Sequence, residues 1–250
     1  RATQLLPRNG GWQVSGHGPD GTAFALNASE IVCTLPPQTL PDLIGPDLPP
    51  SYRHRLEHLE DPSGALVLYG AVKREHLPPD CPSHLQLGSS HPGSIFVSVS
   101  QDGDGRAPAG QATVIASVFT AARPWFEAPL SEAGARKRHK AELVEQMQRG
   151  LQQLLGLEPA HWLHAELSTP RAFAHWCGRP FGFVGGLGQH PSRFGPFGLA
   201  SRTPLRGLWL CGDAIYPGEG TAGVSLSALM ACRQLLAARG RCLELRTSTS

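Results

Sequence analysis

The stretch LWLCGDAIYPGEGTAGVSLSALMACRQLL, residues 208–236, decides the fold of this chain. Its first residues, Leu208–Cys211, are apolar and short enough to form a buried strand. Gly212 then lets the backbone turn close to another group, and Asp213 places a carboxylate at the carboxyl end of the strand. A glycine-rich loop leads into an apolar run of helical length, Val224–Ala238. Ligands of open α/β sheets bind at the carboxyl ends of the strands, so this turn is the candidate site.

The loop after the strand is built from small residues that a flat ligand can approach closely. We expect the helix to begin near Gly223, and the N-terminus of a helix offers unpaired N–H donors and about half a unit of positive charge. Such an end attracts anions and electron-rich carbonyl groups. The candidate cofactor-binding residues are therefore Gly212, Asp213, Gly220, Thr221, Ala222, Gly223 and Val224.

The letters GEGTAG, residues 218–223, also match the G-x-G-x-x-G pattern of a dinucleotide-binding loop. That pattern needs its glycines directly after a first strand, then a second strand and an acidic residue about 20 residues further on. Here AIYP separates CGD from GEG, and the few residues around Glu244 cannot complete a βαβ unit. A strand–turn–helix without a ligand stays open as the structural alternative.

Composition and charge narrow the classes of function. The chain has 250 residues, of which 40% are hydrophobic and 17% charged, as is typical of globular proteins, and its net charge of +2 gives no reason to expect a nucleic-acid partner. No uninterrupted run of about 18 apolar residues indicates a membrane span. The six cysteines form no C-x-x-C, so buried free thiols are expected rather than disulfides. The pairs His54/His58 and His161/His164 lack a supporting cluster of ligands, and no metal site is predicted.

The rest of the chain alternates between short strands and turns, with one clear helix. A hairpin is predicted around Val14 and TAFALNA (22–28), and a long amphipathic helix over 136–156 ends at Gly156. A segment rich in Gly, Pro and Phe, 178–204, is predicted to be a long ordered loop. Further strands are predicted at 31–35, 64–74, 94–101, 112–120 and 162–170, and the strands 94–101 and 112–120 are predicted to pair in antiparallel fashion across a long polar loop. The buried face of the long helix is predicted to carry Leu143, Val144, Met147, Leu151, Leu154 and Leu155.

Residues 207–231, GLWLCGDAIYPGEGTAGVSLSALMA, resemble the C-terminal flavin-binding motif of the phytoene desaturase and carotenoid isomerase family of flavoproteins. With the preceding FVGGLGQHPSRFGPFGLASRTP, the stretch is similar to the carotenoid 3′,4′-desaturases of that family. NASEIVCTLPP (27–37) is similar to the strand by which such chains return to the flavin domain.

The resemblance implies an α/β fold with an α+β substrate region. It would be the C-terminal part of a two-domain FAD-dependent amine-oxidase or desaturase-like fold, without the N-terminal Rossmann βαβ unit. The implied segments are 1–40, returning strands of the FAD-binding domain; 41–204, a substrate-binding domain with an antiparallel sheet and a helix; and 205–250, the C-terminal strand, loop and helix of the FAD-binding domain.

The resemblance also implies FAD as the cofactor. Asp213 would accept a hydrogen bond from the ribityl chain, and the backbone of Thr221–Val224 would face the flavin ring or the pyrophosphate. The helix dipole would stabilise negative charge at the N1–C2 edge of the flavin. The implied function is desaturation of a carotenoid or other polyene by hydride transfer, and no residue is assigned as a catalytic acid or base.

Three alternatives stay open. The first is carotenoid cis–trans isomerisation, and the second is amine oxidation, for which Tyr216 and Trp209 are the only candidate aromatics near the loop. The third is a non-catalytic relative resembling Rab escort factors, which bind lipidated partners. The expected partners are the polyene, a missing N-terminal FAD-binding half and a membrane surface, with the protein cytoplasmic and peripherally attached to a photosynthetic or plasma membrane. The isolated chain is expected to be inactive and to bind FAD weakly or not at all.

Overall fold

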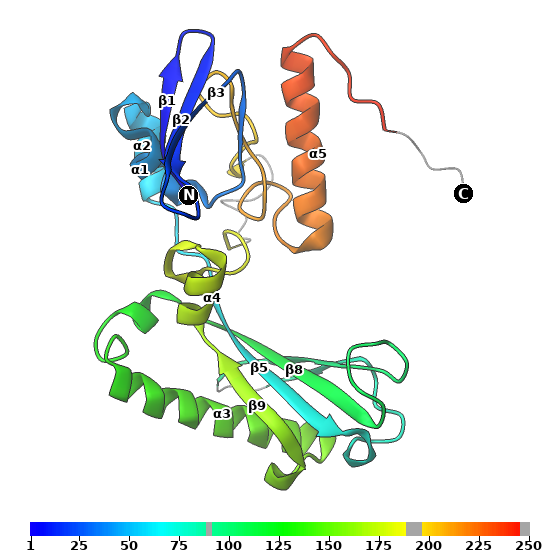
Figure 1. The fold of residues 1–250 in the computed structure, drawn as a ribbon. Coiled ribbons are helices and arrows are strands. Elements are labelled where there is room, and N and C mark those ends of the chain that lie inside the picture. Colours follow the sequence, from blue (N-terminus) through cyan, green and yellow to red (C-terminus); the bar gives the residue numbers. More distant parts are fainter. Residues whose placement is uncertain (89–91, 189–196, 246–250) are drawn as a thin grey trace. The chain divides into compact units, whose positions relative to one another are not determined.

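A computed structural model of the chain describes residues 1–88, 92–188 and 197–245. These residues form two compact units (Figure 1). Unit 1 consists of Arg1–Pro62 and Gly185–Ser250, and unit 2 of Ser63–Val184. Both units combine helices with sheets, as expected for a mixed α and β fold.

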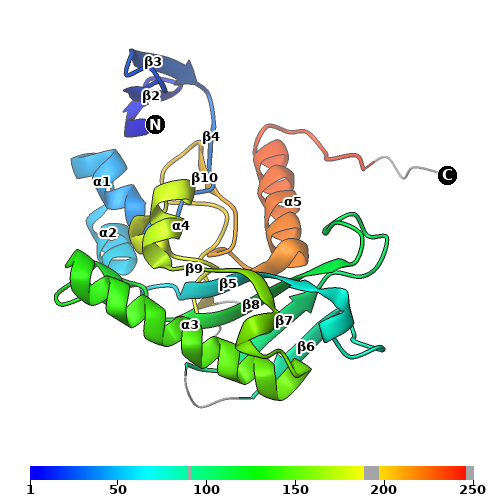
Figure 2. The same cartoon turned by 60° about the horizontal axis from the view of Figure 1, so that its bottom comes forward.

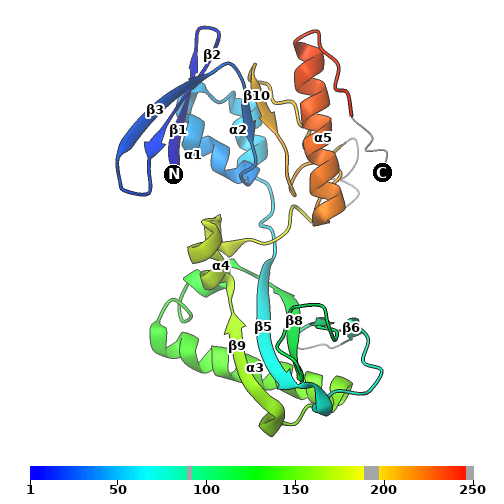
Figure 3. The ribbon, with the colours of Figure 1, turned by 45° about the vertical axis from the view of Figure 1, so that its right-hand side comes forward.

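Unit 1 contains two small sheets. In the first, β1 (Ala2–Arg8), β2 (Gly11–His17) and β3 (Ala23–Ala28) form an antiparallel meander in that order. This confirms the predicted hairpin, and β1 is an addition that the sequence did not indicate. In the second, β10 (Leu208–Leu210) pairs in parallel with β4 (Ile31–Cys33), as Figure 3 shows beside α5.

The core of unit 1 collects residues from distant parts of the chain. Two short helices, α1 (Leu40–Ile44) and α2 (Pro50–Glu57), bury Leu40, Ile44 and Leu56 in the same cluster as Leu208 and Leu210 of β10. Residues 41–62, 185–188 and 197–204 therefore belong with the candidate site, not with the substrate region in which we expected them; the part of the predicted loop at 189–196 lies outside the described residues. The expected boundaries at 40 and 204 differ from the observed ones because this shared apolar core holds those segments.

Unit 2 is one antiparallel sheet covered by a helix (Figure 2). The strand order is β6-β7-β8-β5-β9, and neighbouring strands pair in antiparallel fashion, including the predicted β7–β8 pair. Side chains of β8 alternate between the core and the outer face, as one-sided burial requires. The strands are β5 (Gly64–Lys73), β6 (His84–Leu87), β7 (Ile95–Val99), β8 (Gln111–Thr120) and β9 (Trp162–Ser168).

The long helix of unit 2 is α3 (Ala133–Leu155). It buries Leu143, Met147, Leu151 and Leu155 in the core cluster of the sheet, at the spacing of one helix face. The next residue, Gly156, has the left-handed conformation (φ 71°) that ends many helices, which confirms its predicted role as terminator. A shorter helix, α4 (Pro170–Cys177), follows β9.

The loop between β7 and β8 is stabilised by a carboxylate. The Arg106 backbone N–H and guanidinium donate hydrogen bonds to Asp104, and the Gln101 N–H adds another. These hydrogen bonds lower the pKa of Asp104 to about 2. The loop between β7 and β8 is thus held in one conformation by side-chain hydrogen bonds.

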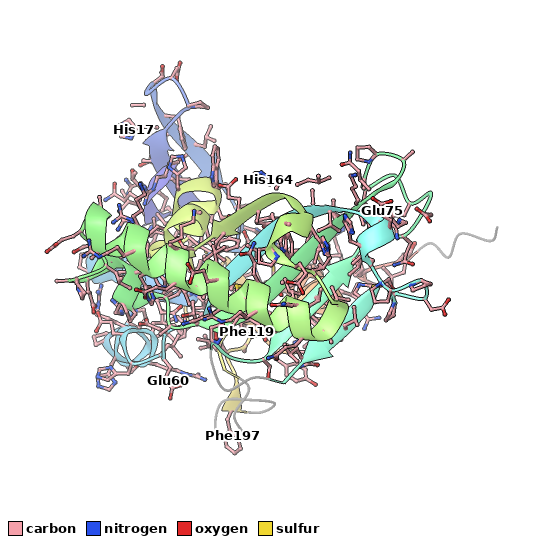
Figure 4. The ribbon with its side chains drawn as sticks, turned by 90° about the horizontal axis from the view of Figure 1, so that it is seen from below. His17, Glu60, Glu75, Phe119, His164 and Phe197 are labelled. Atoms are coloured by element: carbon pink, nitrogen blue, oxygen red, sulfur yellow. The ribbon has the colours of Figure 1, made fainter. Side chains whose placement is uncertain are left out.

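The face of the sheet away from α3 carries aromatic side chains. Tyr69, Phe96 and Phe119 are 42%, 47% and 68% exposed. The strand register puts the three rings on one face, because residues paired across two strands point to the same side of the sheet. Phe119 is paired with Ala65 of β5, and Ala65 shares a side with Tyr69 because both are odd-numbered. Phe96 is paired with Ser117, which is in turn paired with Val67 on that same side of β5. His164 of β9, opposite Ala71, shares this face; Figure 4 labels it together with Phe119.

Candidate functional site

The candidate site begins where β10 ends. The Cys211 N–H still donates to the Cys33 carbonyl at 3.1 Å, and the chain then leaves the sheet at Gly212. Gly212 has φ 122°, a conformation that residues with a side chain rarely adopt. Asp213 therefore stands at the carboxyl end of the strand, as the sequence predicted.

Two successive turns carry the chain from the strand to the helix. The Ile215 N–H donates to the Gly212 carbonyl at 3.2 Å, and the Gly218 N–H donates to the Ile215 carbonyl at 2.9 Å. Ile215 is only 2% exposed and anchors the loop in the core of unit 1. The loop is thus fixed by hydrogen bonds and by burial before any ligand is considered.

The helix α5 (Gly220–Ala238) begins three residues earlier than expected. Gly220 has φ 82°, and a Cβ on Gly223 would lie 2.6 Å from the Gly218 carbonyl oxygen, so both positions require glycine. The residue before the helix, Glu219, makes no capping hydrogen bond with its side chain. The first-turn N–H donors are therefore not taken by the residue that usually caps them.

The structure brings all the predicted site residues to one place. Gly212 and Asp213 follow β10, and Gly220–Val224 form the first turn of α5. Gly220, Thr221 and Ala222 are exposed, while the other site residues are half-buried. Each predicted site residue is therefore at least partly accessible to solvent.

Sequence reasoning missed four residues that hold this loop: Gly185, Gly186, Glu219 and Ser227. Ser227 is fully buried in α5, and its Oγ accepts a hydrogen bond from the Gly212 N–H at 3.1 Å. The Gly186 N–H donates to Glu219 Oε2 at 3.1 Å. Two features of the sequence could have pointed to these residues: a glycine pair in the 178–204 segment and a serine inside an apolar helix. Neither feature indicates which residue it contacts.

The two aromatic residues considered for amine oxidation differ in their position relative to the loop. Trp209 is 4% exposed and donates to Glu30 Oε2 at 2.7 Å, so its side chain faces the amino end of β4 rather than the loop. A cavity of about 650 Å³ lies at that amino end, lined by Glu30, Trp209 and Arg239 among others. Tyr216 is 40% exposed within the loop.

The thiols divide into two groups. Cys33, Cys81 and Cys211 are buried, as predicted, and burial raises the pKa of each. The prediction was wrong for the remaining cysteines, which are exposed because they lie on helix surfaces or beyond the last helix: Cys177, Cys232 and Cys242. All six are free thiols.

The histidine pairs do not gather further ligands in the described part of the chain. His54 and His58 stack on each other with ring centroids 4.0 Å apart. His161 stacks on His76 at 3.9 Å instead of meeting His164. No group of three or more His, Cys, Asp or Glu side chains that could hold a metal ion occurs among residues 1–88, 92–188 and 197–245.

A site made of a strand, a glycine-rich loop and a helix is typical of proteins that bind nucleotide cofactors. The family comparison shows to which family of such proteins the chain belongs. Residues 3–236 match the model of the flavin containing amine oxidoreductase family. The chain belongs to that family. It therefore belongs to a class of oxidoreductases whose cofactor is a flavin.

The chain is similar to several known proteins. It is 27% identical over 183 residues to the chloroplastic prolycopene isomerase of Arabidopsis thaliana, a match covering 69% of this chain and 30% of that protein. Among solved structures, it resembles cyclohexylamine oxidase from Brevibacterium oxydans (TM-score 0.60, 14% identity, 95% of this chain and 47% of that one). It also resembles an oxidoreductase from Methanosarcina mazei (TM-score 0.55, 15% identity, 92% and 47%).

These likenesses confirm the expected fold class, a mixed α and β fold of the FAD-dependent amine-oxidase kind. The chain spans 47% of the length of the two solved chains and 30% of the prolycopene isomerase. The activity, substrates and partners of the whole protein are therefore taken up as proposals.

The loop fits a flavin on its own geometry. Its glycines, Gly212, Gly220 and Gly223, leave the backbone without side chains at the turn, and the first-turn donors of α5 are not capped by Glu219. Asp213, whose carboxylate is an acceptor, follows Gly212 in the same turn. The turn thus carries residue types suited to a ring carbonyl and to a sugar-like hydroxyl.

Proposed function

We propose that this chain forms part of an FAD-dependent oxidoreductase that acts on a carotenoid or another long polyene. The observation that carries the proposal is the turn between β10 and α5, where Asp213 precedes a helix start that the side chain of Glu219 does not cap. The similarity to prolycopene isomerase supports the choice of polyene, since that relative is named for one. FAD supplies the redox chemistry, accepting a hydride or electrons from the substrate.

Each site residue has a physical role in holding FAD. Asp213 accepts a hydrogen bond from a ribityl hydroxyl, and Gly212 allows the turn that puts this carboxylate at the sheet edge. The backbone N–H groups of Thr221–Val224, at the positive end of α5, face the electron-rich edge of the flavin or its pyrophosphate. We assign no catalytic acid or base.

Unit 2 offers a surface suited to an apolar chain. Tyr69, Phe96 and Phe119 share the sheet face opposite α3, and Ile115 lies between Tyr69 and Ser98 on the same face. Aromatic rings and aliphatic side chains bury a polyene favourably, because its surface is entirely apolar. The few charged groups on this face, such as Glu166, would orient the polar end of a substrate.

Two reactions compete within this proposal. Desaturation transfers a hydride, while cis–trans isomerisation leaves the substrate at its original oxidation level. The similarity to prolycopene isomerase favours testing isomerisation beside desaturation. Amine oxidation is a weaker alternative for this chain, because Trp209 is buried in the core and its ring N–H donates to Glu30.

We further propose that an N-terminal FAD-binding half completes unit 1. The parallel sheet of unit 1 has only β10 and β4 among the described residues, and parallel sheets are ordinarily larger and covered on both faces. Only 11% of the apolar α5 window is buried, although this helix is long and apolar enough, by length and composition, to cross a membrane. The solved cyclohexylamine oxidase chain is about twice as long as the part that this chain matches. We propose that a further protein layer, of the size of the unmatched part, covers α5.

A membrane surface is the source we propose for the substrate, because long polyenes dissolve in lipid rather than in water. The protein would then be cytoplasmic and peripherally attached to a photosynthetic or plasma membrane. Liposome flotation of the protein tests this location, and recovery of the protein only in the unbound fraction would contradict it.

The test of the function combines cofactor and substrate. FAD fluorescence quenching should show stoichiometric binding to the full-length protein, and D213A should weaken it about 10–100-fold, the range for a hydrogen bond to a charged group. D47N, an exposed position of unit 1, serves as the control. Polyene conversion in liposomes, followed by absorption and chromatography, then separates desaturation from isomerisation. Absence of FAD binding by the full-length protein would refute the proposal.

A further inference from the structure

The backbone just before Asp213 is tied to α5 by one buried hydroxyl. Ser227 lies two turns into α5 and is 0% exposed. Its Oγ accepts the Gly212 N–H at 3.1 Å, which ties the end of β10 to the helix. A polar side chain buried in an apolar helix is costly unless it is hydrogen-bonded, so this bond gives a physical reason for a serine at this position.

The peptide bond that follows Asp213 is approached closely by the backbone of Gly186, the second residue of a glycine pair. A Cβ on Gly186 would lie 1.8 Å from the Asp213 carbonyl oxygen and 3.0 Å from the Ala214 nitrogen. The backbone of Gly186 therefore rests directly on the Asp213–Ala214 peptide, and only glycine permits that approach.

Glu219 fastens these glycines to the start of α5. Its Oε2 accepts the Gly186 N–H at 3.1 Å, and a Cβ on Gly185 would lie 2.0 Å from the same oxygen. The carboxylate thus turns away from capping its own helix and toward the glycine pair. Segments 33 residues apart in sequence are joined by this bond.

We infer that Ser227 and Glu219 are positioning residues, which clamp the backbone of Gly212–Ala214: Ser227 bonds the Gly212 N–H from α5, and Glu219 holds Gly186 against the Asp213–Ala214 peptide. The clamp fixes where the Asp213 carboxylate points without either residue touching a ligand. This inference rests on the proposed function in one respect: the ligand that Asp213 meets is FAD. The clamp itself is a property of the chain alone.

Residue-resolved hydrogen exchange by NMR tests the clamp without any cofactor. S227A should speed exchange of the Gly212 amide at least tenfold, because its acceptor is gone. S225A, the same substitution at an exposed site of the same helix, should leave it unchanged. E219A should likewise speed exchange of the Gly186 amide at least tenfold, whereas E219Q should stay within about threefold, because its amide oxygen still accepts.

Unchanged exchange at both amides in folded variants would overturn the clamp. Glu219 is exposed, so its variants keep the test decisive if S227A fails to fold, which circular dichroism reports. An increase in exchange with E219Q as large as with E219A would also overturn it, because the rescue by a neutral acceptor would be absent.

FAD titration of the full-length protein tests the second half of the inference. S227A and E219A should weaken FAD binding about tenfold while S225A and E219Q stay within about threefold. Faster exchange in the variants with unchanged FAD affinity would overturn the link between the clamp and the cofactor. Absence of FAD binding by the unsubstituted protein would instead refute the proposed function, and the exchange data would still decide the clamp.

Discussion

Glu30 provides the sharpest test of how unit 1 is held together. Its carboxylate accepts the Trp209 Nε1–H at 2.7 Å through one oxygen and the Arg239 guanidinium at 2.7 Å through the other. Glu30 therefore connects β10 to the end of α5 at the amino end of the sheet. Its two partners lie 179 and 209 residues away in the sequence. We expect E30A to destabilise unit 1.

The magnitude follows from the surroundings of the two bonds. Trp209 is 4% exposed, so removing its acceptor leaves a buried N–H unsatisfied, at a cost of about 1–3 kcal/mol. The Arg239 side chain is 48% exposed, and solvent reduces its ion pair to about 0.2–1 kcal/mol. E30A should therefore lower the free energy of unfolding by about 1–4 kcal/mol. E30Q should cost about 1 kcal/mol or less, since its amide oxygen can still accept from Trp209.

Urea denaturation followed by circular dichroism and tryptophan fluorescence measures these differences. E57A is the matched control, because Glu57 forms an exposed ion pair with Arg53 at 3.4 Å that should contribute about 0.5 kcal/mol or less. A double-mutant cycle of E30A with R239A should give a coupling of about 0.5–1 kcal/mol. The reasoning is refuted if E30A matches E57A, or if E30Q costs as much as E30A.

Three further predictions concern the core of unit 2, the ionisation of Asp104 and the reactivity of the thiols. M147A should destabilise unit 2 by about 2–4 kcal/mol in urea denaturation, because Met147 is fully buried, and K137A on the exposed side of the same helix should change it by about 0.5 kcal/mol or less. The pKa of Asp104, lowered from 3.8 to about 2, means that its contribution to stability is complete above pH 4 and is lost as the pH falls through 2; an NMR titration midpoint near 4 would contradict this. Iodoacetamide at pH 7.5 should label the exposed Cys177 at least tenfold faster than Cys211, whose burial hides the thiol and raises its pKa, and equal rates by mass spectrometry would count against the structure.

Local patterns predicted the elements whose information is local. The period of apolar residues located α3, and Gly156 ended it where the sequence placed the end. Alternation and turn residues located the β2–β3 hairpin and the long strands of unit 2. In contrast, β1 (Ala2–Arg8) was missed, because its ATQLLPR does not alternate and its pairing partner β2 decides its conformation.

The extent of the two units could not be predicted from the same patterns. Residues 41–62 have no motif that assigns them to the site-bearing unit, and they join it because Ile44, Leu48 and Leu56 complete a core with β10. Cysteine exposure was likewise beyond the sequence, since it depends on which helix faces are covered.

The sequence alone determined the strand, glycine loop and helix of residues 208–238, because strand length, positive-φ glycines and helical periodicity are all written in consecutive residues. It also determined which residues surround the turn, from Gly212 and Asp213 to the first turn of α5. Only the tertiary structure decided how that turn is held: Ser227 reaches back to Gly212, and Glu219 reaches across to Gly186. Hydrogen bonds between residues 15 and 33 positions apart depend on where folding brings two segments, and no local periodicity encodes that distance.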